Sequence, residues 1–243
     1  MKPNLEQIES ELGELSRRLS PEAAYYWERH QPRYRHVMGI LADLGSRRAF
    51  PRILDVGMGF QTLFLARMFP ESRVDCLGNR EDSRYRPENP FTFYRVDLDE
   101  APYQPDSEAP PPGEFDLIVF MEVLEHLCTP PEPVIGYLAS RLRDGGILAV
   151  TTPNAAWLKN RIKMLCGRNP FETLRPDRND RGHIREYTRA ELERAFAPSG
   201  LRRLLLERRS LYHFNNTKDE VYSRIADLTH PSLRRSMVAV YQK

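Results

Sequence analysis

The chain has 243 residues, of which 40% are hydrophobic and 29% are charged, enough to bury one sizeable core. Its 36 basic and 34 acidic side chains give a net charge of +2, too balanced to indicate a nucleic-acid-binding protein as a whole. The three cysteines are odd in number and form no Cys-x-x-Cys pair, which argues against a disulfide framework and against a zinc site.

Targeting and membrane signals are also missing from the sequence. No apolar run approaches the roughly 18 residues that indicate a transmembrane helix, and the first residues lack the apolar stretch of a secretory signal. We therefore expect a cytoplasmic protein with no membrane span.

The first predicted elements are two helices. Apolar residues recur at helical spacing from Leu5 to Leu19, and Ser20-Pro21-Glu22 then begins a second helical stretch through Leu44. A short β-branched run over 51–56 stops at Gly57-Met58-Gly59, and a helical pattern resumes over 61–69. This order predicts a helical cap over 1–46, followed by a strand, a glycine turn and a helix.

The rest of the chain indicates an α/β domain over 47–243. Short apolar runs over 74–77, 91–96, 115–120 and 147–151 alternate with polar or helical connectors, which is typical of parallel βαβ units. Five prolines over 101–113 indicate a surface loop, and residues 154–187 interrupt the pattern as a basic insertion. A helix then opens at Thr188 with Glu191 as its capping-box partner, and late strands over 201–206 and 237–241 flank a helix over 218–228.

The glycine turn is the first candidate binding site. A strand that ends in Asp55 and runs into Gly57-x-Gly59 places backbone N–H groups at the carboxyl edge of a parallel sheet, where doubly wound folds bind ligands. The pattern is not the dinucleotide fingerprint, because Thr62 occupies the third glycine position and no phosphate-binding lysine follows. A tight turn without a ligand remains the alternative.

Four motifs in order resemble those of class I S-adenosylmethionine-dependent methyltransferases. Residues 53–59 look like the family's first motif and 115–120 like its fourth strand. Residues 142–146 resemble the turn before the fifth strand, and 151–154 resemble the segment after it. The resemblance spans about 52–206 and implies a Rossmann-like, mostly parallel, seven-stranded sheet with N-terminal helices and an insertion after strand five.

The resemblance also implies which residues bind the cofactor. The carboxylate of Asp55 and the amides of Gly57 and Gly59 would hold the methionine end of S-adenosylmethionine, and Asp97 would accept from the adenine amino group. The set of predicted cofactor contacts is completed by Gly78, Asn79, Leu98 and Met121.

One position departs from the family pattern. The second strand of the family usually ends in an acidic residue that holds both ribose hydroxyls, but this chain has Gly78 there. Asn79 could take that role, or Asp75 after a register slip, although Asp75 is equally interpretable as a solvated strand residue.

The segment after the fourth strand is a candidate metal site. If Glu122-Val123-Leu124-Glu125-His126 forms a helical turn, its two carboxylates and its imidazole lie on one side. Mg²⁺ or another divalent cation held there would favour the deprotonated form of an acceptor hydroxyl. The segment resembles ubiquinone-pathway O-methyltransferases and small-RNA 2′-O-methyltransferases, and by that resemblance His183 is the fourth ligand.

A metal-free reading of the same residues is also open. Many class members carry a Glu-His pair here that only braces the cofactor loop or acts as a base. His126 or His183 would then be the general base, because imidazole accepts a proton near physiological pH. Glu122 completes the predicted catalytic residues.

Acceptor recognition should depend on the parts added to the sheet. Nine basic residues against four acidic ones between Lys159 and Arg189 favour an anionic acceptor, because guanidinium groups bind phosphate bidentately. A merely solvated basic face is the alternative. Aromatic residues between Tyr25 and Tyr34 could cover the cofactor, or could simply pack.

Together these patterns predict an enzyme that methylates a hydroxyl of a small or glycan-linked, phosphorylated acceptor. The insertion loosely resembles methyltransferases of polysaccharide and natural-product pathways. An RNA 2′-O-methyltransferase is the nearest alternative, although the net charge of +2 does not favour a nucleic acid. A cofactor-binding regulatory or scaffold subunit without catalysis is the other, and Gly78 motivates it.

Overall fold

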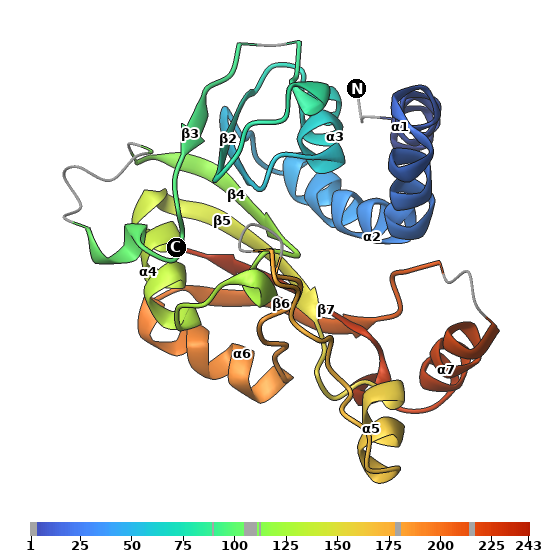
Figure 1. Ribbon diagram of the computed structural model, residues 1–243. Coiled ribbons are helices and arrows are strands. Elements are labelled where there is room, and N and C mark those ends of the chain that lie inside the picture. The colour runs from blue at the N-terminus through green and yellow to red at the C-terminus, as the bar shows by residue number, and fades with distance from the viewer. Residues whose placement is uncertain (1–3, 89, 105–110, 112, 178–180, 214–216) are drawn as a thin grey trace.

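The computed structural model describes residues 4–88, 90–104, 111, 113–177, 181–213 and 217–243. Its centre is a seven-stranded sheet with the strand order β3-β2-β1-β4-β5-β7-β6 (Figure 1). The first five strands in sequence pair in parallel, whereas β7 is antiparallel to both β5 and β6. The predicted fold class, a mostly parallel doubly wound sheet, is therefore confirmed.

The strands match the predicted apolar runs closely. They are β1 (Arg52–Val56), β2 (Arg73–Gly78), β3 (Phe93–Arg95), β4 (Phe115–Met121), β5 (Leu142–Pro153), β6 (Arg202–Arg209) and β7 (Ser236–Gln242). β5 begins five residues before the predicted run over 147–151, because its ladder with β4 already starts at Phe115 and Leu142, with a bulge between Phe115 and Leu117.

The described residues form seven α-helices. They are α1 (Leu5–Leu19), α2 (Pro21–Gly45), α3 (Phe60–Met68), α4 (Pro131–Arg141), α5 (Leu158–Leu165), α6 (Arg189–Phe196) and α7 (Thr217–Leu228). Short 3₁₀ turns occur at Ser83–Tyr85, Ala101–Tyr103, Leu124–His126, Ala197–Ser199 and Pro231–Leu233. The predicted loop over 101–113 lies partly outside the described residues. None of the described helices combines the length and hydrophobicity needed to cross a membrane.

Polar caps fix where several helices begin. The Asn4 side chain accepts from the backbone of Gln7, and the Ser20 hydroxyl accepts from Ala23 N at 3.1 Å. Thr188 and Glu191 form the predicted reciprocal capping box at the start of α6. These local signals explain why helix starts were predictable from the sequence.

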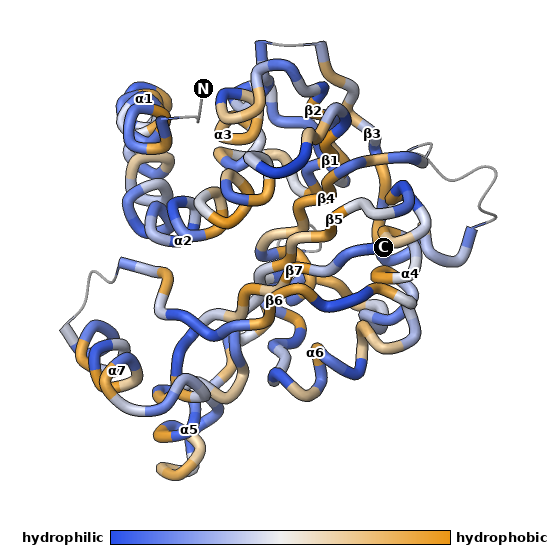
Figure 2. Tube along the Cα trace, turned by 180° about the vertical axis from the view of Figure 1, so that it is seen from behind, coloured by the Kyte–Doolittle hydropathy of each residue, from blue (hydrophilic) through white to orange (hydrophobic). Residues whose placement is uncertain are grey.

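The core has two layers, one on each face of the sheet. One face packs against α1, α2 and α3 through buried residues such as Leu12, Trp27 and Phe64. The other face packs against α4 and α6 through residues such as Leu138 and Phe196. In Figure 2 the hydrophobic colour is concentrated along the strands between these layers. The sheet is thus covered on both faces, and α5 and α7 project away from it as a separate lobe (Figure 1).

Candidate active site

The glycine turn between β1 and α3 is held by a local hydrogen-bond network. Gly57 has φ +89°, a left-handed conformation that glycine adopts without strain. The Thr62 hydroxyl donates to Asp55 Oδ2 at 2.5 Å and accepts from Gly59 N at 3.0 Å. The Gln61 amide also donates to the carbonyl of Gly57. Strand, turn and helix are therefore bonded into one rigid corner at the carboxyl edge of the sheet.

Asp55 lies beneath this turn. Its side chain is fully buried, and its Oδ1 atom has no hydrogen-bond partner among the described residues. Burial raises the pKa of Asp55 to about 8, and the hydrogen bond from Thr62 opposes the shift only in part. The structure thus makes Asp55 a support for the turn, and the cavity described next is lined by other residues.

A cavity of about 260 Å³ opens above the turn. Gly57, Gly59 and Met121 line it, as three of the predicted cofactor contacts, and Glu122 also faces it. The remaining lining residues are Tyr26, Met58, Phe60, Gln61, Tyr85 and Val123. The aromatic rings suit a ligand that carries a positive charge, and the glycines let such a ligand approach the backbone closely.

The other predicted cofactor residues follow the neighbouring strands at the same sheet edge. Gly78 ends β2 and Asn79 follows it on the surface, while Asp97 and Leu98 come after β3. Asp97 is exposed and its Oδ1 accepts from Asp99 N at 2.9 Å. The interpretation of Asp75 as a solvated residue is wrong: it is fully buried and accepts from Thr92 N at 2.7 Å.

Glu122 forms a buried ion pair with a helix far away in the sequence. Its Oε2 atom lies 3.3 Å from the Arg33 guanidinium of α2 and accepts from the Tyr212 hydroxyl. Its Oε1 accepts from the Thr151 hydroxyl of β5 at 2.8 Å. Burial would lower the pKa of Arg33, but Tyr212 and Glu122 raise it well above its ordinary value. This carboxylate is therefore neutralised by a permanent cation.

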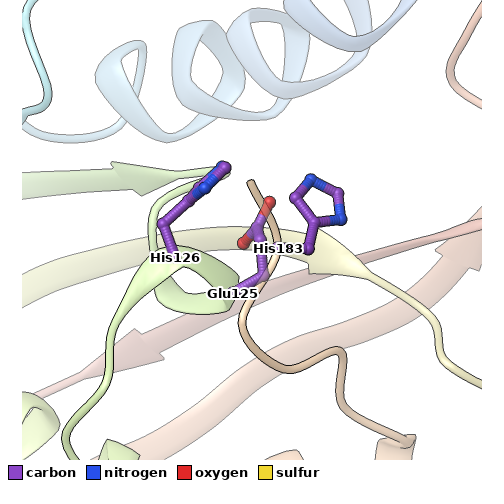
Figure 3. Close-up of side chains that lie close together, drawn as sticks. All are labelled: Glu125, His126 and His183. Carbon is purple, nitrogen blue, oxygen red and sulfur yellow. The ribbon is translucent and has the colours of Figure 1, made fainter. Parts of the chain in front are cut away.

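Glu125, His126 and His183 form a compact group with metal-ligand chemistry. One potential ligand atom from each lies within 4.8 Å of the others. The centroids of the two imidazole rings are 4.9 Å apart, and the ring planes are nearly perpendicular, at 82°. In Figure 3 the carboxylate of Glu125 stands between the two rings, with α2 passing over the group.

The structure does not bring Glu122 into this group. The predicted helical turn starts only at Leu124, as a 3₁₀ turn, and Glu122 has φ +53°, so its side chain leaves in a different direction toward Arg33. Of the four predicted metal ligands, three are thus brought together.

The contacts around the group hold both rings in place. His126 Nδ1 lies 2.9 Å from the Gly182 carbonyl, and His183 Nδ1 lies 3.1 Å from Glu186 Oε1. The backbone carbonyl of Glu125 accepts from Ile184 N at 2.7 Å and from Arg185 N at 3.1 Å. The end of the insertion is thereby fastened to the turn after β4, which is why His183 meets His126.

Burial controls the charge of this group. Burial and the negative charge of Glu122 raise the pKa of Glu125 well above its usual range. Its Oε2 accepts from the Thr152 hydroxyl at 3.1 Å, while its Oε1 is buried without a hydrogen-bond partner among the described residues. For His183, burial lowers the pKa, but Glu186 outweighs this effect and the net pKa is raised.

A second, larger cavity of about 460 Å³ adjoins His183. Its apolar walls come from Ala155, Ala156, Phe171, Leu174 and Ile184, and its polar lining from Glu172, His183, Arg185, Glu186, Thr188 and Glu191. Arg185 is the one basic residue of the insertion that lines this cavity within the described residues, and it pairs with Glu191 at 2.8 Å. Arg178 and Asp180 lie outside the described residues. The predicted arginine cluster therefore does not converge on this cavity.

The aromatic residues of α2 divide between two roles. Tyr26 lines the cavity above the glycine turn and lies against the ring of His30, with ring centroids 4.1 Å apart and a tilt of 32°. Trp27 and Tyr34 are buried in the core, where they stack on each other at 5.4 Å. The sequence reasoning missed Arg33 and Tyr212, because no local pattern marks a residue whose partner lies in a distant segment.

The comparisons with known proteins agree with this geometry. A family model described as a methyltransferase domain matches residues 26–206. The N-methyltransferase NodS from Bradyrhizobium japonicum, solved with S-adenosyl-L-homocysteine, has a TM-score of 0.55 at 14% identity, over 95% of this chain and 96% of that chain. A search of curated proteins gave no match.

Two further solved structures show the same fold. A S-adenosylmethionine-dependent methyltransferase from Archaeoglobus fulgidus has a TM-score of 0.55 at 15% identity, over 85% of this chain and 92% of that chain. Another from Mesorhizobium loti has a TM-score of 0.54 at 18% identity, over 79% of this chain and 90% of that chain. At such low identity these structures establish the fold.

Proposed function

Because this chain belongs to the methyltransferase domain family and is a class I S-adenosylmethionine-dependent methyltransferase, we propose that it methylates a hydroxyl of an acceptor bound beside His183. The observation that carries the proposal is the convergence of Glu125, His126 and His183 within 4.8 Å, at the sheet edge that also holds the glycine turn. An alcohol is a poor nucleophile at neutral pH, so a group that takes its proton favours methyl transfer to oxygen.

The residues at the glycine turn fit the cofactor. The amides of Gly57 and Gly59 donate to the Leu77 carbonyl and the Thr62 hydroxyl, so we propose that these glycines admit the methionine end by their lack of side chains. The rings of Tyr26, Phe60 and Tyr85 can face the positive charge of the cofactor. When bound, S-adenosylmethionine supplies a methyl group that is already activated on sulfur. We propose Asp97, Leu98, Gly78 and Asn79 for the adenosine end, where no acidic residue stands at position 78 to hold the ribose.

The acceptor side places and deprotonates the hydroxyl. Alignment of donor and acceptor at near-attack distance supplies much of the rate of an in-line methyl transfer. The acceptor oxygen would bond to the methyl carbon as the carbon–sulfur bond breaks, and the hydroxyl proton would pass to a ring nitrogen of His183 or His126. Glu186 keeps His183 oriented and raises its pKa, which favours the ring as the acceptor of the hydroxyl proton.

A divalent cation is a second element of the proposal. Two imidazoles and a buried carboxylate with an unpartnered oxygen are the donors that Mn²⁺, Fe²⁺ or Zn²⁺ prefer, more than Mg²⁺. Each ring also has the second contact, a carbonyl or a carboxylate, that orients metal-binding histidines. A cation held there would lower the pKa of the acceptor hydroxyl. Glu122 is paired with Arg33 and stays outside this proposed ligand set.

The shape of the second cavity bears on the acceptor. Its apolar walls suit a hydroxyl carried on an apolar scaffold, and an anionic group of the acceptor would have to bind outside the cavity, among the basic residues of the insertion. A lipid-linked or phosphorylated glycan meets both conditions. RNA does so less well, because the lining includes three carboxylates. We place the reaction in the cytoplasm, in keeping with cysteines that remain free thiols.

Calorimetry with S-adenosylmethionine and its demethylated product tests the cofactor half of the proposal. We expect saturable binding of both to the full chain. If neither compound binds measurably, the proposed enzymatic activity is wrong and the protein shares only the fold. Binding of both compounds, with no methyl transfer to any acceptor in a cell extract, would favour the regulatory subunit.

The histidine group is tested by His126→Ala and His183→Ala. We expect either change to lower the rate of demethylated-product formation by about 10²- to 10⁴-fold, with cofactor affinity unchanged within a few-fold. His230→Ala on the surface is the matched control. Titration with Mn²⁺ distinguishes a metal-binding role of the histidines from a role as general base. Mn²⁺ binding by the wild type that both variants lose would support the cation. Full activity of the wild type in excess chelator would assign the histidines to proton transfer alone.

A further inference from the structure

Helix α7 carries an apolar stripe on its solvent side. Val221, Ile225 and Leu228 follow the i, i+4, i+7 spacing of one helix face, and all three are exposed, Leu228 to 87%. The opposite face of α7 buries the small residues Ser223 and Ala226. The stripe is therefore not needed to attach α7 to the rest of the chain.

A basic residue lies on each side of this stripe. With about 100° of rotation per residue, Lys218 and Arg224 fall on either flank of the line through Val221 and Ile225, and both are exposed, with Arg224 paired to Glu220 at 2.5 Å. An exposed apolar stripe on an amphipathic helix can lie in the surface of a membrane, and the positive charge that attracts it to anionic lipids has to come from the residues around α7, because α7 itself has two basic and three acidic residues.

Helix α5 and the segment after it continue the same character. Met164 and Leu165 end α5 with exposed side chains, Leu165 to 87%, and Phe171 and Leu174 are exposed next along the chain. Of the eleven exposed large hydrophobic side chains in the described residues, seven lie on α5, this segment or α7. Such a concentration marks an interaction surface.

The two helices form one structural unit. Lys159 of α5 pairs with Asp219 of α7 at 2.6 Å, and Arg161 donates to the Ser232 hydroxyl after α7 at 3.3 Å. Figure 1 shows both helices in the lobe that projects from the sheet, and Figure 2 shows hydrophobic colour on both from the other side. We call residues 155–177 and 217–235 the basic lobe.

The charge of the basic lobe differs from that of the remaining chain. It contains nine lysines and arginines against five acidic residues, a net +4, whereas the whole chain has +2. Arg161 and Lys163 donate to the backbone carbonyls of Ala156 and Pro170, and these acceptors carry no formal charge. An anionic surface is the complement of this lobe.

We propose that the basic lobe docks on the surface of a membrane that contains anionic lipids, with the apolar stripe of α7 and the end of α5 inserted at the level of the headgroups. Phe171 and Leu174 belong both to the lobe and to the wall of the cavity beside His183. A docked lobe would thus hold the mouth of that cavity at the lipid surface. The docking itself does not depend on the methyl-transfer chemistry.

A second copy of the chain is the competing occupant. Two lobes of net +4 repel each other when they face directly, which argues against that pairing. Sedimentation of the protein alone, over a range of concentrations, detects it independently of any lipid.

Co-sedimentation with vesicles tests the proposal on the full chain. We expect binding to phosphatidylcholine vesicles that contain phosphatidylglycerol, and little binding to phosphatidylcholine alone. Ile225→Glu and Lys218→Glu should each weaken binding about tenfold, since a buried apolar side chain and each basic residue contribute comparable free energies. Leu204→Glu is the control, because Leu204 is an exposed leucine of β6 outside the lobe.

Three results would overturn the proposal. The first is that the protein does not bind the anionic vesicles. The second is that Leu204→Glu weakens vesicle binding as much as Ile225→Glu and Lys218→Glu do. The third is a dimer that Ile225→Glu dissociates, without vesicle binding. Thermal unfolding and calorimetry with the demethylated cofactor show whether each variant remains folded, so a failed docking result is distinguishable from a failure of the proposed enzyme.

Discussion

The glycine turn and the Arg33–Glu122 cluster sit at the same edge of the sheet but are built in opposite ways. At the turn, Asp55, Gly59 and Thr62 bond to one another within eight residues of sequence. At the cluster, Glu122 meets Arg33 and Tyr212 from segments far before and after it. The turn is specified by residues close together in the sequence, whereas the cluster forms only when the tertiary structure brings its distant segments together.

This difference suggests different energetic roles. A local network rigidifies the chain before it packs, while a buried charge depends entirely on its distant partner and is costly without it. We therefore expect substitutions in the cluster to affect the stability of the whole domain, and substitutions at the turn to affect mainly the cofactor site.

Arg33→Met should give the largest effect. It leaves the Glu122 carboxylate in a mostly buried position without its cation, which typically costs about 3–5 kcal/mol of unfolding free energy. Urea unfolding measures the loss. The double variant with Glu122→Gln should recover much of it, because no charge is then left unpaired.

Arg47→Met is the matched control for this cluster. Arg47 pairs with Asp43 on the surface at 2.8 Å, and both side chains are more than half exposed, so the expected cost is below about 1 kcal/mol. Equal losses for Arg33→Met and Arg47→Met would contradict the distinction between the two regions.

Gly57→Ala probes the turn and should have a smaller effect. At φ +89° an alanine is strained, and its Cβ would lie 3.2 Å from Val123, so we expect a loss of about 1–3 kcal/mol and weaker binding of the demethylated cofactor. Calorimetry and urea unfolding measure the two effects.

Gly136→Ala separates conformational strain from a general effect of glycine replacement. Gly136 lies in α4 with no atom within 4 Å of an added Cβ, so alanine there should be neutral or stabilising by up to about 1 kcal/mol. If Gly57→Ala is also neutral or stabilising, the turn does not require the left-handed backbone conformation of a glycine at position 57.

The same contrast explains what the sequence could predict. The strands, the glycine turn and the Thr188 capping box depend on residues close together in the sequence, and all were predicted near their observed places. Thr62 was noticed only as a departure from the dinucleotide pattern, although its hydroxyl joins Asp55 to Gly59. Residue type and spacing gave its position but not its bonds.

The acceptor side was predicted less completely for the same reason. A helical turn from Glu122 to His126 would have put both carboxylates on one side, but the attraction of Arg33 is a tertiary effect that spacing cannot reveal. The meeting of His183 with His126 was suggested by family resemblance. The physical cause, two backbone N–H groups bonded to the Glu125 carbonyl, appears only in the structure.

A further difference between the two regions is the pH dependence that Asp55 gives to the turn. The pKa of Asp55 is about 8 in the folded chain against an ordinary 3.8, so between these values the folded state keeps a proton that the unfolded state has released. Raising the pH through this window therefore favours unfolding, at no more than about 1.4 kcal/mol per pH unit, and the effect ends above the folded pKa. Asp55→Asn should remove this slope, because its amide does not titrate and its oxygen can still accept from Thr62.

Thermal or urea unfolding from pH 5 to 8, without cofactor, measures the slope for both proteins. As the pH rises, the unfolding free energy of Asp55→Asn should increase steadily relative to that of the wild type. The exposed substitution Asp43→Asn should leave the pH dependence of the wild type unchanged. Parallel curves for wild type and Asp55→Asn would mean that Asp55 is ionised beneath the turn. A charged Asp55 would then need a cation close to its unpartnered Oδ1, and the turn would depend on a distant partner as the cluster does.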